Sequence, residues 1–176
     1  MSHSIKKFFI FFVVCLLVWY TLYELVLRPS IIYDAWVIES IAQQAGLLLE
    51  WFNYTVQVED RLYTGYLNYV SLVGSQGVVI GPGCDGLVVM ALFSFFILCM
   101  PGAVKHKLWF IPLGVVSLHV LNVIRASVLT VIMAKNPEWL AFNHDYTFTA
   151  LIYGFVFLLW VSWTKCVANS LSANEK

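Results

Sequence analysis

Residues 81–100 read GPGCDGLVVMALFSFFILCM, in which a glycine- and proline-rich turn runs directly into an apolar segment. Glycine adopts backbone angles that other residues avoid and proline presets the first position of a turn, so the first six residues predict a tight turn. The apolar residues 86–100 predict a helix that enters a membrane, although fifteen residues are few for a full span. Cys84 lies in the turn, at the mouth of this helix.

The composition of the whole chain indicates an integral membrane protein. Of its 176 residues, 61% are hydrophobic and 11% are charged, whereas a soluble domain averages about 45–50% apolar and about 25% charged residues. The formal net charge of zero argues against a nucleic-acid partner, which would favour a basic surface. The four cysteines show no spacing typical of a metal site.

Four apolar runs are candidates for membrane spans, at 8–27, 86–100, 108–133 and 147–164. About twenty apolar residues in a helix cross a hydrocarbon core roughly 30 Å thick. The first run follows two lysines and could also be read as a secretory signal peptide. Its length, and the polar residues that follow it in place of a small-residue cleavage site, favour an uncleaved anchor.

The charges between the runs give these spans an orientation. With four spans, the N-terminus, the loop 101–107 and the C-terminal tail share one side of the membrane. The lysines of that side are Lys6, Lys7, Lys105, Lys107 and Lys165. Because cytoplasmic segments carry an excess of Lys and Arg, we predict that this side is cytoplasmic, and that Cys84 and His144 lie on the outer side.

The segment between the first two runs has a different pattern. Residues 30–51 mix apolar with acidic and amide side chains at helical periodicity, and Ser30 is a candidate N-cap. Such a helix fits an interfacial or externally packed position better than a membrane span. In 53–80, alternating β-branched and aromatic residues predict short strands, with a hairpin turn at 74–77.

These elements predict an all-α membrane protein with about four transmembrane helices, an external amphipathic helix and a small β-hairpin. We expect a single membrane-embedded domain over 1–176. Within it, 1–80 form an N-terminal anchor and an external segment, and 81–165 form the catalytic core.

Arg125 is the most unusual side chain in the apolar runs. A charged residue inside a span costs about 2.5–3.5 kcal/mol by insertion scales and usually marks a functional site. It lies seventeen residues into the run 108–133, or roughly 26 Å at 1.5 Å per residue, which places it near the outer boundary of the membrane. A guanidinium near a helix end can also simply reach the lipid headgroups. Asn122, one turn earlier, could orient Arg125, line the same cavity or make a structural bond between helices.

Cys84 differs from Cys15, Cys99 and Cys166, which we interpret as small apolar side chains. It is the only cysteine on the predicted outer face, so it has no evident disulfide partner in the chain. A helix N-terminus and a nearby cation both favour the reactive thiolate, whereas Asp85 would oppose it if the carboxylate faced the sulfur. Lipidation, or pairing with a second chain, is the alternative for a lone external cysteine.

Two histidines compete for the role of functional imidazole. His144 lies at a membrane boundary in the sequence Asn143-His144-Asp145-Tyr146, beside potential orienting groups. His119 lies in the middle of the run 108–133. The histidines lie in no sequence motif that is typical of haem binding, so the sequence gives no support for a haem site.

The order of these motifs resembles that of the exosortase/archaeosortase family: Pro-Gly-Cys-x-Gly before one span, Asn-x-x-Arg inside the next, and a histidine before the last. The residues that carry the resemblance are Gly83-Cys84-Asp85-Gly86, Asn122-Val123-Ile124-Arg125 and His144. It covers about 81–165, half of the chain, and is similar to the short members with about four spans rather than eight. Asp85 stands where a small polar residue is common, and 8–80 carry no motif of the family.

The resemblance implies a cysteine transpeptidase or endopeptidase in the plasma (inner) membrane of a prokaryote, with its active site facing the outside or the periplasm. The implied substrates are exported proteins that end in a short motif, a transmembrane helix and a basic tail. Cys84 would attack the scissile carbonyl and form a thioester, while His144 would protonate the departing amine and then activate the acceptor. Arg125 would stabilise the thiolate or the oxyanion. The supporting residues would be Gly83, Asp85, Gly86 and Asn122, and no metal or organic cofactor is needed.

Two other functions are consistent with the sequence. The first is a non-enzymatic membrane assembly or transport-associated subunit, in which Arg125 pairs with an acidic group of a partner helix. The second, a thiol redox protein, is less favoured because no second external cysteine accompanies Cys84. The sequence leaves open the recognition motif, the acceptor (water or an amine) and the participation of an accessory membrane protein.

Overall fold

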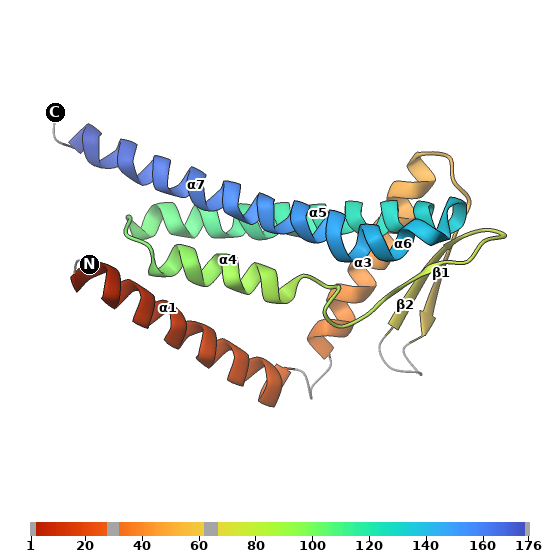
Figure 1. The fold of residues 1–176 in the computed structure, drawn as a ribbon, viewed down its shortest axis with the longest axis horizontal. Helices are drawn as coiled ribbons and strands as arrows, with labels where there is room; N and C mark the ends of the chain where they lie inside the picture. Colours follow the sequence, from red (N-terminus) through yellow and green to blue (C-terminus); the bar gives the residue numbers. More distant parts are fainter. Residues whose placement is uncertain (1–2, 28–31, 62–66, 175–176) are drawn as a thin grey trace.

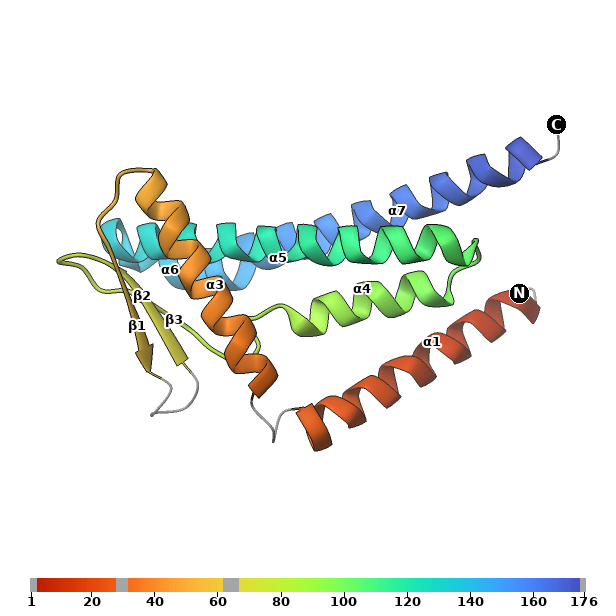
Figure 2. The same ribbon diagram turned by 180° about the vertical axis from the view of Figure 1, so that it is seen from behind.

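The computed structural model describes residues 3–27, 32–61 and 67–174, and most of them are helical (Figure 1). Along the chain the elements are α1 (His3–Leu22), η1 (Tyr23–Leu27), α3 (Ile32–Trp51), β1 (Val56–Arg61), β2 (Leu67–Leu72), β3 (Val78–Ile80), α4 (Leu87–Cys99), α5 (Val104–Lys135), η3 (Pro137–Trp139), α6 (Leu140–Phe142), η4 (Asn143–Thr147) and α7 (Phe148–Asn174). The long helices α1, α4, α5 and α7 extend along the length of the molecule, and α3 crosses α5 near one end, beside a small sheet (Figures 1 and 2).

The sheet has three antiparallel strands in the order β1-β2-β3. The turn between β2 and β3 occupies 73–77, where the sequence predicts a hairpin, and Gly74 adopts the positive φ of +82° that favours glycine. The hairpin prediction is thus confirmed but incomplete, because β1 pairs along the whole of β2 as a third strand. β1 lies within the range 53–80 for which the sequence predicts short strands, and Val56 and Val58 alternate in it with polar residues.

The predicted helix over 30–51 is confirmed as α3, whereas its proposed cap Ser30 lies outside the described residues. One core cluster joins α3 to the sheet and to α5; its members include Ile38, Ile41, Ala45, Val70, Ile80, Val123 and Ala126. Burying a large aliphatic side chain stabilises a fold by about 1.5–3 kcal/mol relative to leaving it exposed. This cluster therefore fixes β3, and the turn that follows it, against α5.

A second core cluster lies among α4, α5 and α7 and is rich in aromatic rings; its members include Met90, Phe93, Ile97, Leu118, Val156 and Trp163. Phe93 is fully buried, and its ring lies directly against the backbone of Gly114. The absence of a side chain at Gly114 lets α4 and α5 approach closely, which sets the position of the start of α4.

Among the described residues, the segments 104–135 and 137–166 are long and apolar enough to cross a membrane. α4 has only 13 residues, about 20 Å of helix at 1.5 Å per residue, which is less than the hydrocarbon thickness. The first apolar run forms helix α1 and its continuation η1. The described residues thus include two clear candidate spans, and the four-span topology stays a prediction.

The segment 137–147, which joins the last two apolar runs, is helical throughout. Pro137 stands in the first turn of η3, where its missing N–H leaves no bond unmade, and α6 and η4 continue without a break into α7. His144 therefore lies in a helical turn and not in a loop, so its position is fixed by the backbone of α7.

Candidate active site

The turn before α4 is built by its proline and glycines. The N–H of Cys84 donates to the carbonyl of Gly81 at 2.9 Å, and Gly83 has a φ of +89°. Proline at the second position and a positive-φ glycine at the third define a type II turn. The turn reverses the chain after β3 and leaves the half-buried Cys84 side chain at its exit.

Gly86 and Asp85 start the helix directly after Cys84. Gly86 has a φ of +78°, and its carbonyl accepts the first helical hydrogen bond, from the N–H of Met90 at 2.9 Å. The Asp85 side chain is only 1% exposed, and its Oδ1 accepts the N–H of Leu87 at 3.2 Å. This carboxylate is thus directed at the N-terminus of α4, where a negative charge is favoured by the helix dipole.

Asn122 of α5 fixes the turn from the other side. It is 3% exposed, and its Nδ2 donates to the carbonyl of Cys84 at 2.8 Å. A side chain on Gly86 would meet this amide, since a Cβ built there lies 3.2 Å from Nδ2. The bond ties the cysteine backbone to the helix that carries Arg125, one turn further along.

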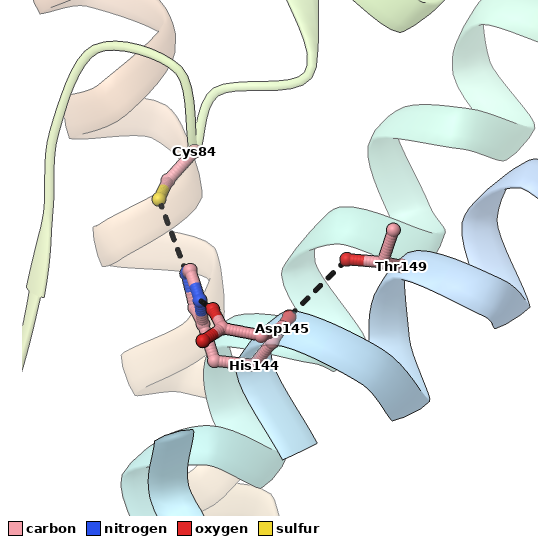
Figure 3. A network of polar contacts seen from close by, with 4 residues as sticks. All are labelled: Cys84, His144, Asp145 and Thr149. Carbon is pink, nitrogen blue, oxygen red and sulfur yellow. Dashed lines mark hydrogen bonds and ion pairs between the residues drawn. The ribbon is translucent and has the colours of Figure 1, made fainter. Parts of the chain in front are cut away.

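His144 faces the cysteine sulfur (Figure 3). The Sγ of Cys84 is 3.7 Å from Nε2 of His144, and the Nδ1 of the same ring is 2.7 Å from Oδ1 of Asp145. A carboxylate can only accept a hydrogen bond, so the proton of the neutral imidazole belongs on Nδ1. Nε2 is then free to accept the thiol proton of Cys84.

A small cavity of about 30 Å³ completes the site. It is lined by Val78, Val79 and Ile80 of β3, by Cys84 and His144, and by Asn122, Arg125, Ala126 and Leu129 of α5. Within the described part of the chain, the guanidinium of Arg125 has no hydrogen-bond or ion-pair partner. The structure thus brings the three residues predicted as catalytic to one cavity, and the described residues leave the Arg125 cation in its wall without an ion-pair partner.

A family model described as transmembrane exosortase matches residues 3–164. The chain belongs to this family. No curated protein and no solved structure matches the chain. The matched range includes the N-terminal half, although 8–80 carry no motif that the sequence alone reveals.

In this exosortase the two candidate imidazoles have separate surroundings. His119 lies 3.0 Å from Gln44, joining Nε2 to Oε1 between α5 and α3, and it does not line the cavity of Cys84. His144 is therefore the imidazole in contact with the cysteine. Among the described residues, no three His, Cys, Asp or Glu side chains gather into a group that could hold a metal ion.

The structure adds two features of the exosortase site that the sequence did not single out. Asp145 was noted only as one of several neighbours of His144, and nothing in the sequence distinguished it from Asn143 as the orienting group. Residues Val78, Val79 and Ile80 were predicted as strand, but their place in the cavity wall depends on how β3 packs on α5. No periodicity or spacing signals such a contact.

Proposed function

We propose that this exosortase is a membrane cysteine protease and transpeptidase that cleaves C-terminal sorting signals of exported proteins at the outer face of the membrane. The observation that carries the proposal is the 3.7 Å approach of Cys84 Sγ to His144 Nε2 beside the guanidinium of Arg125, which has no ion-pair partner among the described residues. A thiol, a base and a cation around one cavity are the parts that acyl transfer requires.

In the acylation step, the thiol proton of Cys84 passes to Nε2 of His144 and the thiolate attacks the scissile carbonyl carbon. A carbon–sulfur bond forms and the carbonyl oxygen becomes an oxyanion. The carbon–nitrogen bond then breaks, and the imidazolium of His144 returns its proton to the departing amine. The products are a thioester on Cys84 and the released C-terminal segment with its transmembrane helix and basic tail.

Arg125 is the group in the cavity wall that can stabilise negative charge. Its guanidinium is not occupied by an ion pair within the described chain, so it is available to the thiolate and to the oxyanion. Removing a single oxyanion-stabilising donor typically costs about 10²–10³ in rate. Asn122 acts on the backbone instead, since its amide holds the Cys84 carbonyl.

Deacylation uses the same histidine in the opposite direction. Neutral His144 takes a proton from the acceptor, which attacks the thioester carbonyl and releases the Cys84 thiolate. The cavity of about 30 Å³ has room for one water or one amine head, because a single water needs roughly 10–15 Å³ of such space. An amine acceptor gives transpeptidation and a water acceptor gives hydrolysis.

The alternative is a non-enzymatic membrane subunit. The observation that favours it is the guanidinium of Arg125, which has no ion-pair partner within the described part of the chain. An intramembrane cation normally pairs with another group, and an acidic side chain of a partner helix would supply one. This function gives no reason for the approach of Cys84 to His144, which the protease accounts for directly.

The two functions are separated by single substitutions in the full chain in its native membrane. We expect Cys84→Ala, His144→Ala and Arg125→Ala each to lower processing of an exported reporter with a C-terminal transmembrane helix and basic tail by at least about 10². Matched controls are Cys166→Ala and His119→Ala, which change the same residue types outside the cavity. Normal processing in all three site variants, with loss of a membrane complex in Arg125→Ala alone, would replace the protease by the subunit.

A further inference from the structure

The cavity at Cys84 follows the edge of strand β3. Three consecutive residues of that strand, Val78, Val79 and Ile80, line it. Side chains of consecutive strand residues point to opposite faces of a sheet, so a cavity that reaches all three runs along the strand backbone. Ile80 is 3% exposed and Val79 is 46% exposed, which fits an edge between a buried and an open face.

Among the described strands, β3 is also the last of its sheet, because it pairs with β2 alone. The N–H of Val73 donates to the carbonyl of Thr55 on the β1 side at 2.9 Å. Successive residues of a strand direct their backbone groups to alternate sides. Counting back from Val73 along an unbroken register, Tyr69 also faces β1, whereas Val70 faces β3.

This alternation fixes the direction of the backbone groups of β3. Val79 lies opposite Tyr69, which is turned away from β3, so the pair exchanges no ladder hydrogen bonds. The N–H and C=O of Val79 therefore point outward, away from β2. Within the described part of the chain, neither group has a backbone partner in another element.

We propose that the substrate's polypeptide backbone adds to β3 as a fourth strand, exchanging two hydrogen bonds with the N–H and C=O of Val79. The strand leads through the type II turn to Cys84, and both residues line the same cavity. A substrate paired at Val79 thereby has its scissile carbonyl delivered to the sulfur in extended form. This inference rests on the proposed protease function, since it concerns how that site holds a peptide.

Strand addition has a defined physical consequence for recognition. Main-chain hydrogen bonds supply affinity that does not depend on side chains, and pockets beside alternate residues supply the selectivity. Such bonds each change binding by about two- to tenfold. The enzyme would therefore accept varied sequences around the scissile bond, provided that they can be extended.

The test compares two alkylating reagents on Cys84 of the purified full chain, with Cys15, Cys99 and Cys166 replaced by serine. Acetyl-tetraalanine chloromethyl ketone can pair with β3 and transfers its methylene carbon to the sulfur with loss of chloride. Iodoacetamide carries out the same S-alkylation without a peptide backbone. Val79→Pro removes the outward N–H while proline remains compatible with an edge strand, and Val79→Ala keeps the N–H as the matched control.

We expect the ratio of the peptide rate to the iodoacetamide rate to fall about tenfold in Val79→Pro and to change less than twofold in Val79→Ala. On the protein with Val79 intact, N-methylation of one of the probe's amides should cause a similar fall, and this measurement does not depend on how the proline variant folds. An unchanged ratio with every N-methylated probe would overturn strand addition. So would a tetraalanine reagent that is no faster than acetyl-alanine chloromethyl ketone.

Failure of strand addition is distinct from failure of the protease function. If these ratios are unaffected while Cys84→Ala and His144→Ala abolish reporter processing, only the strand pairing is wrong. If processing survives in Cys84→Ala, the protease function itself is wrong, whatever the alkylation ratios are.

Discussion

At the scale of single residues, the position of the nucleophile depends on backbone geometry around Cys84 more than on the cysteine itself. Gly83 and Gly86 both have positive φ, and the Asn122 amide bonds to the Cys84 carbonyl close to Gly86. Asp85, which would weaken a thiolate if it faced the sulfur, instead accepts a hydrogen bond from the start of α4. The acidic neighbour is thus used to begin the helix.

The two glycines should respond differently to alanine. Both Gly83→Ala and Gly86→Ala place a Cβ on a left-handed backbone, which costs about 1–2 kcal/mol. A Cβ on Gly83 meets nothing within 4 Å, whereas one on Gly86 lies 3.2 Å from Asn122 Nδ2. We expect similar losses in thermal stability but a roughly tenfold larger loss of processing in Gly86→Ala. Equal activity of the two variants at matched folded fractions would exclude the role given to Asn122.

Asp145 should act as a positioning residue for His144. Oδ1 of Asp145 lies 2.7 Å from Nδ1 of His144 and accepts its proton, while the Asp145 side chain stays 62% exposed. Its loss should therefore affect catalysis and leave the fold intact. We expect Asp145→Ala to lower kcat/KM by about 10- to 100-fold. Asp145→Asn, whose amide oxygen can still accept the proton, should recover part of that loss. Glu138→Ala is the control, an exposed acid near the same end of α7, and should leave processing unchanged.

At the scale of elements, much of the fold could be predicted from local pattern. Helical periodicity gave α3, alternation and glycines gave the β2–β3 hairpin, and the apolar runs gave the long helices. The pairing of β1 with β2, the helical segment 137–147 and the full length of α5 were not predicted. The pairing, and the placement of η4 at the cavity, depend on contacts between segments that lie apart in the sequence. The same limit applies to the site. The sequence placed Cys84, Arg125 and His144 at one membrane depth, but they become neighbours only through the packing of α5 and η4 around β3.

The contact between α4 and α5 should be sensitive to a single methyl group. Gly114→Ala directs a Cβ into the ring of Phe93, which is fully buried and held by the aromatic cluster. Overpacking of this kind costs about 1–3 kcal/mol. Gly154→Ala in α7 meets nothing within 4 Å and gains helix propensity of up to about 1 kcal/mol. Thermal unfolding in detergent should therefore show a lowered midpoint for the first variant and an unchanged or raised midpoint for the second.

At the scale of the whole molecule, the site and the sheet occupy one end, and both termini and the α4–α5 connection occupy the other (Figure 2). Lys105 and Lys107, at the start of α5, thus lie at the opposite end of this helix from the sheet. The Lys excess at the terminal end predicts that it is cytoplasmic. Cleavage of an exported protein requires the opposite end, with Cys84, to face outside.

This orientation can be tested with one cysteine at each end of an otherwise cysteine-free chain. Gln76→Cys lies in the exposed β2–β3 turn, and Lys105→Cys lies in the exposed first turn of α5. A membrane-impermeant maleimide applied to intact cells with a permeabilised outer envelope should label Gln76→Cys at once. It should label Lys105→Cys only after the inner membrane is opened, because the charged reagent cannot cross the hydrocarbon core. The reverse pattern would place the Cys84–His144 pair on the cytoplasmic side, where it could not act on a protein that has already been exported.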